Sequence, residues 1–106
     1  MLEFEVWDTK IKIDDDCNVY RIDKRSKKWT SINNKPNNEG YIHIKLTNNE
    51  KQKRTFKLHR IVYYGYNQQW NIFDTRHDNS IDHKDRCKTN NHIDNLRVAT
   101  HSENKF

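Results

Sequence analysis

The chain has 106 residues, enough for one domain with a modest hydrophobic core, and 32% of them are hydrophobic while 33% are charged. A formal net charge of +5 and a pI near 9.2 indicate a polyanionic partner, such as nucleic acid or an anionic membrane surface. Because the sequence has neither a run of about 18 apolar residues nor a basic N-terminal region followed by an apolar one, a membrane span and a secretory signal are not expected.

The two cysteines, Cys17 and Cys87, stand without the Cys-x-x-Cys pairs that a zinc site uses. A zinc site and a disulfide framework are therefore not expected. Each cysteine is predicted to be a small thiol that is buried or half-buried.

Strands dominate the first half of the chain. Residues 19–22 ("VYRI") and 28–32 ("KWTSI") read as short strands around a turn, and the Pro, Gly and four Asn of residues 33–40 predict a loop. In residues 41–47 ("YIHIKLT"), polar and apolar side chains alternate, which predicts a strand with one buried face. The turn "NNEK" then leads into a returning strand at residues 53–58.

The hydrophobic period changes at residues 58–66 ("LHRIVYYGY"), which predicts a short helix. Its apolar face is formed by Leu58, Ile61, Val62 and Gly65. Residues 67–80 form a polar loop that Trp70 and Phe73 are predicted to pin. The fold class is therefore α+β, with antiparallel β-strands and short helices on them.

The C-terminal segment returns to short strands. Ile81 lies in a predicted strand immediately before Asp82 and His83, and residues 96–99 form a second strand after a loop rich in Asn. An acidic side chain and an imidazole are thus placed next to each other at the end of a strand.

A helix is predicted to begin at Thr100, because "THSE" matches a capping box with Thr100 as the N-cap and Glu103 at N3. The order of elements is then strand, strand, helix. Asn104 would lie in the first turn of that helix and could point back at the strand that carries Asp82 and His83.

These side chains suit one kind of chemistry. A carboxylate and an amide oxygen brought together are hard ligands, which suit Mg²⁺ or Mn²⁺ better than Zn²⁺. A histidine beside them is suited to accept a proton from water. Together they predict metal-assisted hydrolysis of a phosphodiester.

Several separated segments resemble one nuclease family in order and distance. They are "GYIHIKL", "LHRIVYYGY", "IDHKD", "TNNHIDNLRVAT" and "SEN". From about residue 40 to 106 the chain resembles the HNH, or ββα-metal (His-Me finger), nucleases. It is most similar to the phage and intron-borne homing endonucleases whose third motif residue is Asn. Asn95 lies twelve positions after His83, and Asn104 nine positions further on, as in that family.

The resemblance implies a metal-dependent DNA endonuclease that nicks double-stranded DNA and uses one divalent ion, Mg²⁺ or Mn²⁺. It assigns Asp82 and Asn104 as metal ligands and His83 as the general base. It also assigns Asn95 as the residue that tethers the loop and helps to hold the histidine's orientation. One active site per chain predicts a monomer or a weak dimer that cuts one strand per binding event.

The basic side chains are predicted to contact DNA phosphates. The candidates are Lys53, Arg54, Lys57, Arg60, Arg86, Lys88 and Arg97. For each of them, the ordinary alternative is a charge that keeps an exposed edge soluble. Residues 40–106 form the predicted nuclease domain and residues 1–39 an N-terminal β region, a candidate DNA-contacting appendage. The expected location is the cytoplasm, that of the host cell if a phage or virus encodes the protein.

Other histidines are assigned ordinary roles. His101 competes for the third motif position, but it lies only six residues after Asn95. His77 and His92 are predicted to be loop residues, and His59 to pack or hydrogen-bond at the start of the helix.

A non-catalytic DNA-binding module that kept the nuclease fold is the alternative function. The complete set of motif residues argues against it, because a binding module has no need of them. An RNA-binding domain fits less well, since the aromatic residues form no stacking-platform motif. The chain ends two residues after Asn104, which indicates either a minimal stand-alone nuclease or a fragment without a C-terminal DNA-recognition region.

Overall fold

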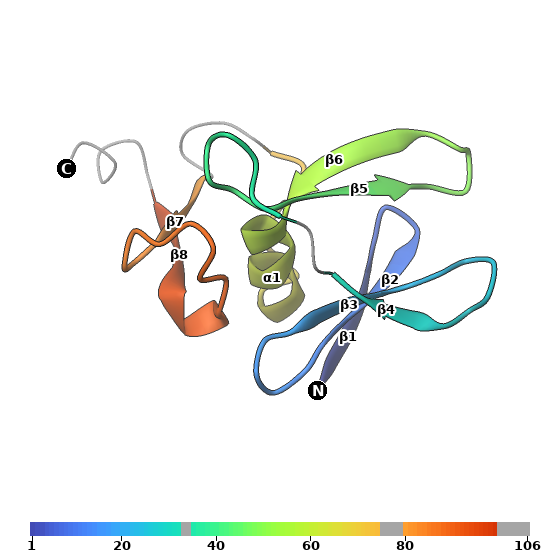
Figure 1. Ribbon diagram of the computed structural model, residues 1–106, viewed down its shortest axis with the longest axis horizontal. Coiled ribbons are helices and arrows are strands. Elements are labelled where there is room, and N and C mark those ends of the chain that lie inside the picture. The colour runs from blue at the N-terminus through green and yellow to red at the C-terminus, as the bar shows by residue number, and fades with distance from the viewer. Residues whose placement is uncertain (33–34, 75–79, 100–106) are drawn as a thin grey trace.

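The computed structural model describes residues 1–32, 35–74 and 80–99. In this part of the chain, antiparallel strands are joined by one α-helix and one 3-10 helix. The elements are β1 (Leu2–Val6), β2 (Thr9–Ile13), β3 (Val19–Ile22), β4 (Trp29–Ser31), β5 (His43–Thr47), β6 (Lys53–Lys57), α1 (Leu58–Tyr66), β7 (Ser80–His83), η2 (Ile93–Asn95) and β8 (Leu96–Ala99). They form a four-stranded sheet in the order β1-β2-β3-β4 and two hairpins, β5-β6 and β7-β8. Figure 1 shows α1 between the N-terminal sheet and the β7-β8 hairpin.

The N-terminal sheet begins with a β1-β2 hairpin that the sequence-based prediction lacks, since its first strand is at residue 19. Trp7 and Asp8 form the turn, with φ angles of 51° and 60°. Two consecutive positive φ values are typical of a type I′ turn, which usually contains Asn and Gly. Because Trp and Asp are not the residues typical of this turn, the hairpin could not be predicted from the sequence pattern. The next strand, β3, coincides with its prediction, and β4 is two residues shorter than predicted.

The predicted hairpin of residues 41–47 and 53–58 is confirmed as β5 and β6, although β5 begins only at His43. Ile44 and Leu46 are buried, while the Lys and Thr that alternate with them are exposed. This is the alternation that predicted the strand. The chain passes from β6 directly into the helix, which fixes the start of α1 at the end of the hairpin.

The predicted helix at residues 58–66 is confirmed as α1, and its predicted apolar face is the buried one. Gly65 lies against the ring of Phe4 so closely that a side chain there would collide with it. The absence of a side chain allows α1 to pack tightly on the N-terminal sheet. Because α1 also contacts β6, β7 and β8, it positions every element around the candidate site.

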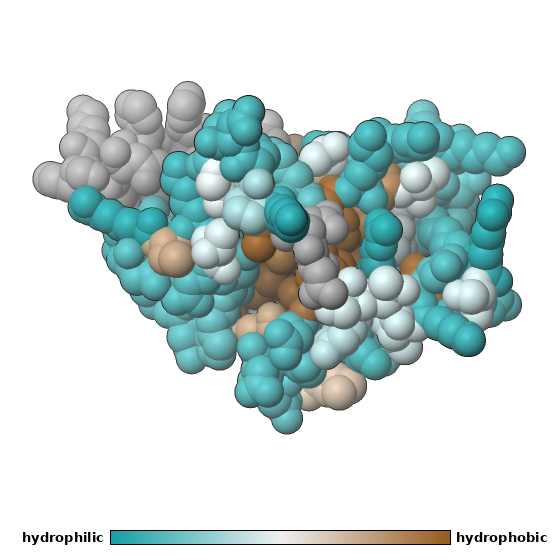
Figure 2. Space-filling model, viewed as in Figure 1, coloured by the Kyte–Doolittle hydropathy of each residue, from teal (hydrophilic) through white to brown (hydrophobic). Residues whose placement is uncertain are grey.

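One hydrophobic cluster joins residues on both sides of position 40. Its buried members are Phe4, Val6, Ile11, Ile13, Val19, Ile44, Leu46, Phe56, Leu58, Ile61, Val62, Ile72, Ile81 and Leu96. Figure 2 shows hydrophobic residues in the middle of this face and hydrophilic residues around its edge. The division into residues 1–39 and 40–106 stays a prediction. The described part of the chain has no helix with the length and apolar character of a membrane span.

Candidate active site

The two predicted C-terminal strands are confirmed as the antiparallel pair β7 and β8. β7 ends in Asp82 and His83, which line the same cleft but differ in exposure. His83 is 4% exposed, whereas Asp82 is half-buried. The predicted helix from Thr100, with Glu103 and Asn104, lies outside the described residues.

Asp82 is paired across the hairpin with Arg97. Arg97 Nη2 donates to Asp82 Oδ2 over 3.3 Å, and the two side chains are 54% and 39% exposed. An ion pair this open to water contributes about 0–1 kcal/mol to stability. The carboxylate is therefore held in position but remains accessible from solvent.

His83 is confined by three side chains. Its Nε2 lies 2.8 Å from Oδ1 of Asn91. The centre of its ring is 4.6 Å from that of His59 and 6.1 Å from that of Tyr41. Since the imidazole is almost completely buried among these groups, it has little freedom to rotate.

Asn95 holds together the loop between β7 and β8. Its Oδ1 accepts from the backbone N–H of Asp85, and its Nδ2 donates to Asp85 Oδ1 and to the carbonyl of Asn90. Its own carbonyl accepts from the N–H of Lys84. Donation from Asn90, together with the N–H of Cys87 and the Asn95 amide, holds the pKa of Asp85 below its ordinary value. Through these hydrogen bonds, Asn95 holds the first residues of the β7-β8 loop close to its last ones.

A cleft of about 780 Å³ opens beside Asp82 and His83. It lies between residues of β6 and the start of α1 on one side and the β7-β8 hairpin on the other. Seven of its lining side chains are basic: Arg54, Lys57, Arg60, Lys84, Arg86, Lys88 and Arg97. Among the described residues that line it, Asp82 is the acidic one. The cleft therefore presents a strongly positive surface to a ligand.

Six of the seven basic residues predicted to contact DNA line this cleft. The exception is Lys53, which lies exposed at the far end of β6. Lys84 lines the cleft but is absent from the prediction. It directly follows the Asp-His pair, and this proximity was the signal in the sequence that could have identified it.

Arg60 contacts the protein itself. Its Nη2 donates to the carbonyl oxygens of Ile72 and Asp74 at 3.0 and 2.9 Å, and its guanidinium lies 4.6 Å from the Trp70 ring centre. Burial lowers the pKa of Arg60. Arg60 and Trp70 thus anchor residues 67–74, in which Ile72 is the buried side chain. Phe73, also predicted to pin the loop, is 44% exposed, but its ring contacts those of Trp7 and Phe56 at 5.9 and 6.1 Å between centres.

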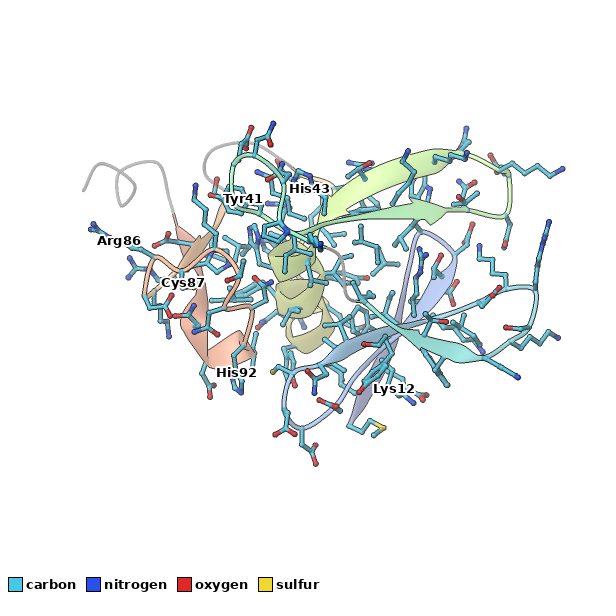
Figure 3. The ribbon with its side chains drawn as sticks, viewed as in Figure 1. Lys12, Tyr41, His43, Arg86, Cys87 and His92 are labelled. Atoms are coloured by element: carbon cyan, nitrogen blue, oxygen red, sulfur yellow. The ribbon has the colours of Figure 1, made fainter. Side chains whose placement is uncertain are left out.

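Tyr41 also lines the cleft, although no sequence pattern predicted it there. Figure 3 shows it beside the N-terminal end of α1, toward the β7-β8 loop. The ammonium groups of Lys57 and Lys88 lie 4.6 and 4.8 Å from its ring centre. Lys88 also donates to the carbonyl of Glu39 over 2.7 Å. Tyr41 thus holds one lysine from each side of the cleft near the site.

His59 is buried at the start of α1, as the packing role predicted for it requires. Its ring centre is 5.4 Å from that of Tyr41, in addition to its contact with His83. The pKa of His59 is lowered to about 3, chiefly by burial and in addition by the positive charges around it. His59 is therefore neutral at physiological pH.

The buried His59 predicts acid sensitivity of the fold. Between about pH 6.5 and 3 the unfolded chain binds a proton at His59 that the folded chain does not, so the free energy of unfolding should fall as the pH falls. The slope from this one group is at most about 1.4 kcal/mol per pH unit. His59→Phe, which keeps a flat ring and cannot titrate, should show a shallower slope. Urea unfolding at several pH values tests this, and equal slopes in the two proteins would contradict it.

The remaining cysteine and histidine expectations are partly confirmed. Cys17 is half-buried, as predicted, but Cys87 is exposed, because it lies in the β7-β8 loop rather than against the core. Its pKa is lowered by hydrogen bonds from Thr89. His92 is the predicted loop residue and caps η2, accepting from the N–H of Asp94.

Of the two predicted metal ligands, Asp82 lies among the described residues. Within residues 1–32, 35–74 and 80–99, no three His, Cys, Asp or Glu side chains gather closely enough to hold a metal ion. Asp82 supplies an accessible carboxylate in the cleft, the hard oxygen donor that Mg²⁺ or Mn²⁺ prefers. The other predicted ligand, Asn104, lies outside the described residues.

Comparison with known proteins gives a match over the C-terminal part of the chain. Residues 74–106 match a family model described as HNH endonuclease. The matched region contains β7, the loop held by Asn95 and β8. No curated protein and no solved structure matches the chain at a significant level. The match supports the resemblance to HNH nucleases over this segment.

Proposed function

We propose that this protein is a metal-dependent endonuclease of the HNH homing type that nicks double-stranded DNA. One observation carries the proposal: Asp82 and His83 lie together at a cleft lined by seven basic side chains. The segment that contains both residues also matches the HNH endonuclease model. A positive cleft attracts the phosphate backbone, and the Asp-His pair supplies the chemistry of hydrolysis.

In the proposed reaction His83 is the general base. It accepts a proton from a water molecule while the water oxygen forms a bond to phosphorus. The bond between phosphorus and the 3′ oxygen breaks, and that oxygen takes a proton from solvent. The products are a 5′ phosphate and a 3′ hydroxyl. A positioned general base typically contributes about 10²–10⁴-fold to the rate.

Asp82 is proposed to hold one divalent ion, Mg²⁺ or Mn²⁺, together with Asn104. The carboxylate fits this role because it is accessible and lies at the cleft beside His83. When bound, such an ion neutralises negative charge on the phosphate and on the leaving oxygen. Arg97, which donates a hydrogen bond to Asp82, is proposed to contact the phosphate group that is cleaved.

The direct test is a plasmid assay. Supercoiled plasmid incubated with the protein should be converted to nicked circles in Mg²⁺ or Mn²⁺ and should remain supercoiled in chelator. His83→Ala purified in the same way is the control for a contaminating nuclease. Binding without conversion in either metal would support the alternative, a DNA-binding module without catalytic activity.

Binding should depend steeply on salt, because the cleft is proposed to contact phosphates. The logarithm of the association constant should fall with the logarithm of salt concentration by about 0.9 for each contacted phosphate. Lys84→Ala removes a charge from the cleft and should make the slope shallower by about 0.9. Lys53→Ala removes the same charge from outside the cleft and is the matched control. Fluorescence anisotropy with a short duplex in chelator measures both, and a wild-type slope for Lys84→Ala would contradict a phosphate contact by Lys84 in the cleft.

A further inference from the structure

The hydrogen bond between His83 and Asn91 determines what the imidazole can do. Nε2 of His83 lies 2.8 Å from Oδ1 of Asn91, and the histidine is 4% exposed. A neutral imidazole has one N–H donor and one nitrogen with a free lone pair. An amide oxygen can only accept, so with this partner the proton is on Nε2 and the lone pair is on Nδ1.

We infer that Asn91 is the positioning residue for the proposed hydrolysis: it fixes His83 as the Nε2–H tautomer and directs Nδ1 as the nitrogen that accepts the water proton. The inference rests on the proposed function for its catalytic consequence. The orientation of the ring is a separate property of the fold that can be measured without any activity.

Asn91, and not Asn95, contacts the histidine directly. The side chain of Asn95 bonds to Asp85 and to the carbonyl of Asn90, the residue before Asn91. Asn95 therefore fixes the backbone from which the Asn91 side chain reaches His83. The predicted role of Asn95 in orienting the histidine is thus exerted through the loop, and the final contact comes from Asn91.

Packing alone does not determine which edge of the His83 ring faces Asn91, so the hydrogen bond determines it. The ring of His83 packs against those of His59 and Tyr41, at 4.6 and 6.1 Å between centres, and these two rings also contact each other. These contacts confine the ring but do not distinguish its two nitrogens, because an imidazole turned by half a rotation fills nearly the same space. The amide oxygen of Asn91 favours one of the two orientations, since only one presents an N–H to it.

The test compares Asn91→Ala with Asn91→Asp. Alanine removes the acceptor and leaves the buried N–H without a partner. Aspartate keeps an acceptor of similar size at the same position. Loss of the partner that orients a metal-ligating histidine typically costs about 10–100-fold, and we expect an effect of the same size for the orientation of His83. Nicking by Asn91→Ala should therefore fall about 10–100-fold at unchanged DNA affinity in chelator, and Asn91→Asp should restore most of the loss.

Nitrogen-15 NMR of the histidine side chains provides a measurement that a merely structural role would not change. In the wild-type protein and in Asn91→Asp, the signals of His83 should show a protonated Nε2. In Asn91→Ala they should shift toward a mixture of tautomers or ring orientations. Asn90→Ala is the matched control: it removes a neighbouring amide that bonds to Asp85, and the signals of His83 should stay unchanged.

Two results would overturn the inference. One is a wild-type spectrum with the proton on Nδ1. The other is an Asn91→Ala protein with unchanged His83 signals, whatever its activity. If no variant and no wild-type protein nicks DNA, the proposed function fails, and the spectra still decide whether Asn91 orients His83.

Discussion

His83→Ala is expected to lower the rate of plasmid nicking by about 10²–10⁴-fold, because it removes the proposed general base. DNA affinity in chelator should stay nearly unchanged, since the imidazole is buried and carries no charge contact to the backbone of DNA in the proposed arrangement. Single-turnover nicking at saturating protein concentration measures the chemical step separately from binding.

Two controls make the result specific. Circular dichroism shows whether the variant keeps its fold after losing a buried ring. His43→Ala removes a histidine that does not line the cleft and should keep nearly full activity. If His83→Ala nicks DNA within about tenfold of the wild-type rate, a group other than His83 activates the water.

Local sequence patterns were sufficient to predict the strands and the helix that surround the site. The alternation around Ile44 and Leu46 predicted β5, and the spacing of apolar residues from Leu58 to Gly65 predicted α1 with its buried face. Both patterns arise because one side of each element packs on the same core. The β7 and β8 strands were also predicted, since they bracket a loop of strongly polar residues.

The residues that converge on the cleft could not be derived in the same way. Lys57 and Lys88 are distant in the sequence, and only the packing of α1 against the β7-β8 hairpin brings both to Tyr41. The contact of Asn91 with His83 depends on the path of the loop that Asn95 holds. Long-range geometry of this kind has no periodic signal in the sequence.

The structure separates the two neighbouring motif residues by environment. His83 is buried and hydrogen-bonded to an amide, which suits a general base whose proton-accepting nitrogen must keep a fixed orientation. Asp82 is accessible and is paired with the exposed Arg97, which suits a group that must bind an ion from solvent. This difference leads to opposite expectations for metal binding by Asp82→Ala and His83→Ala.

Asp82→Ala is expected to lower Mn²⁺ affinity by more than about 100-fold, because loss of even an indirect partner at a metal site costs about 10–100-fold and Asp82 is the proposed charged ligand. His83→Ala should keep Mn²⁺ affinity close to that of the wild-type protein, and Asn104→Ala should fall between the two. Loss of the exposed pair with Arg97 costs only about 0–1 kcal/mol, so Asp82→Ala should remain folded. Calorimetric titration of Mn²⁺ into the three variants separates ligand from base without any measurement of activity. If His83→Ala loses Mn²⁺ as completely as Asp82→Ala does, His83 is a metal ligand and its assignment as the base is wrong.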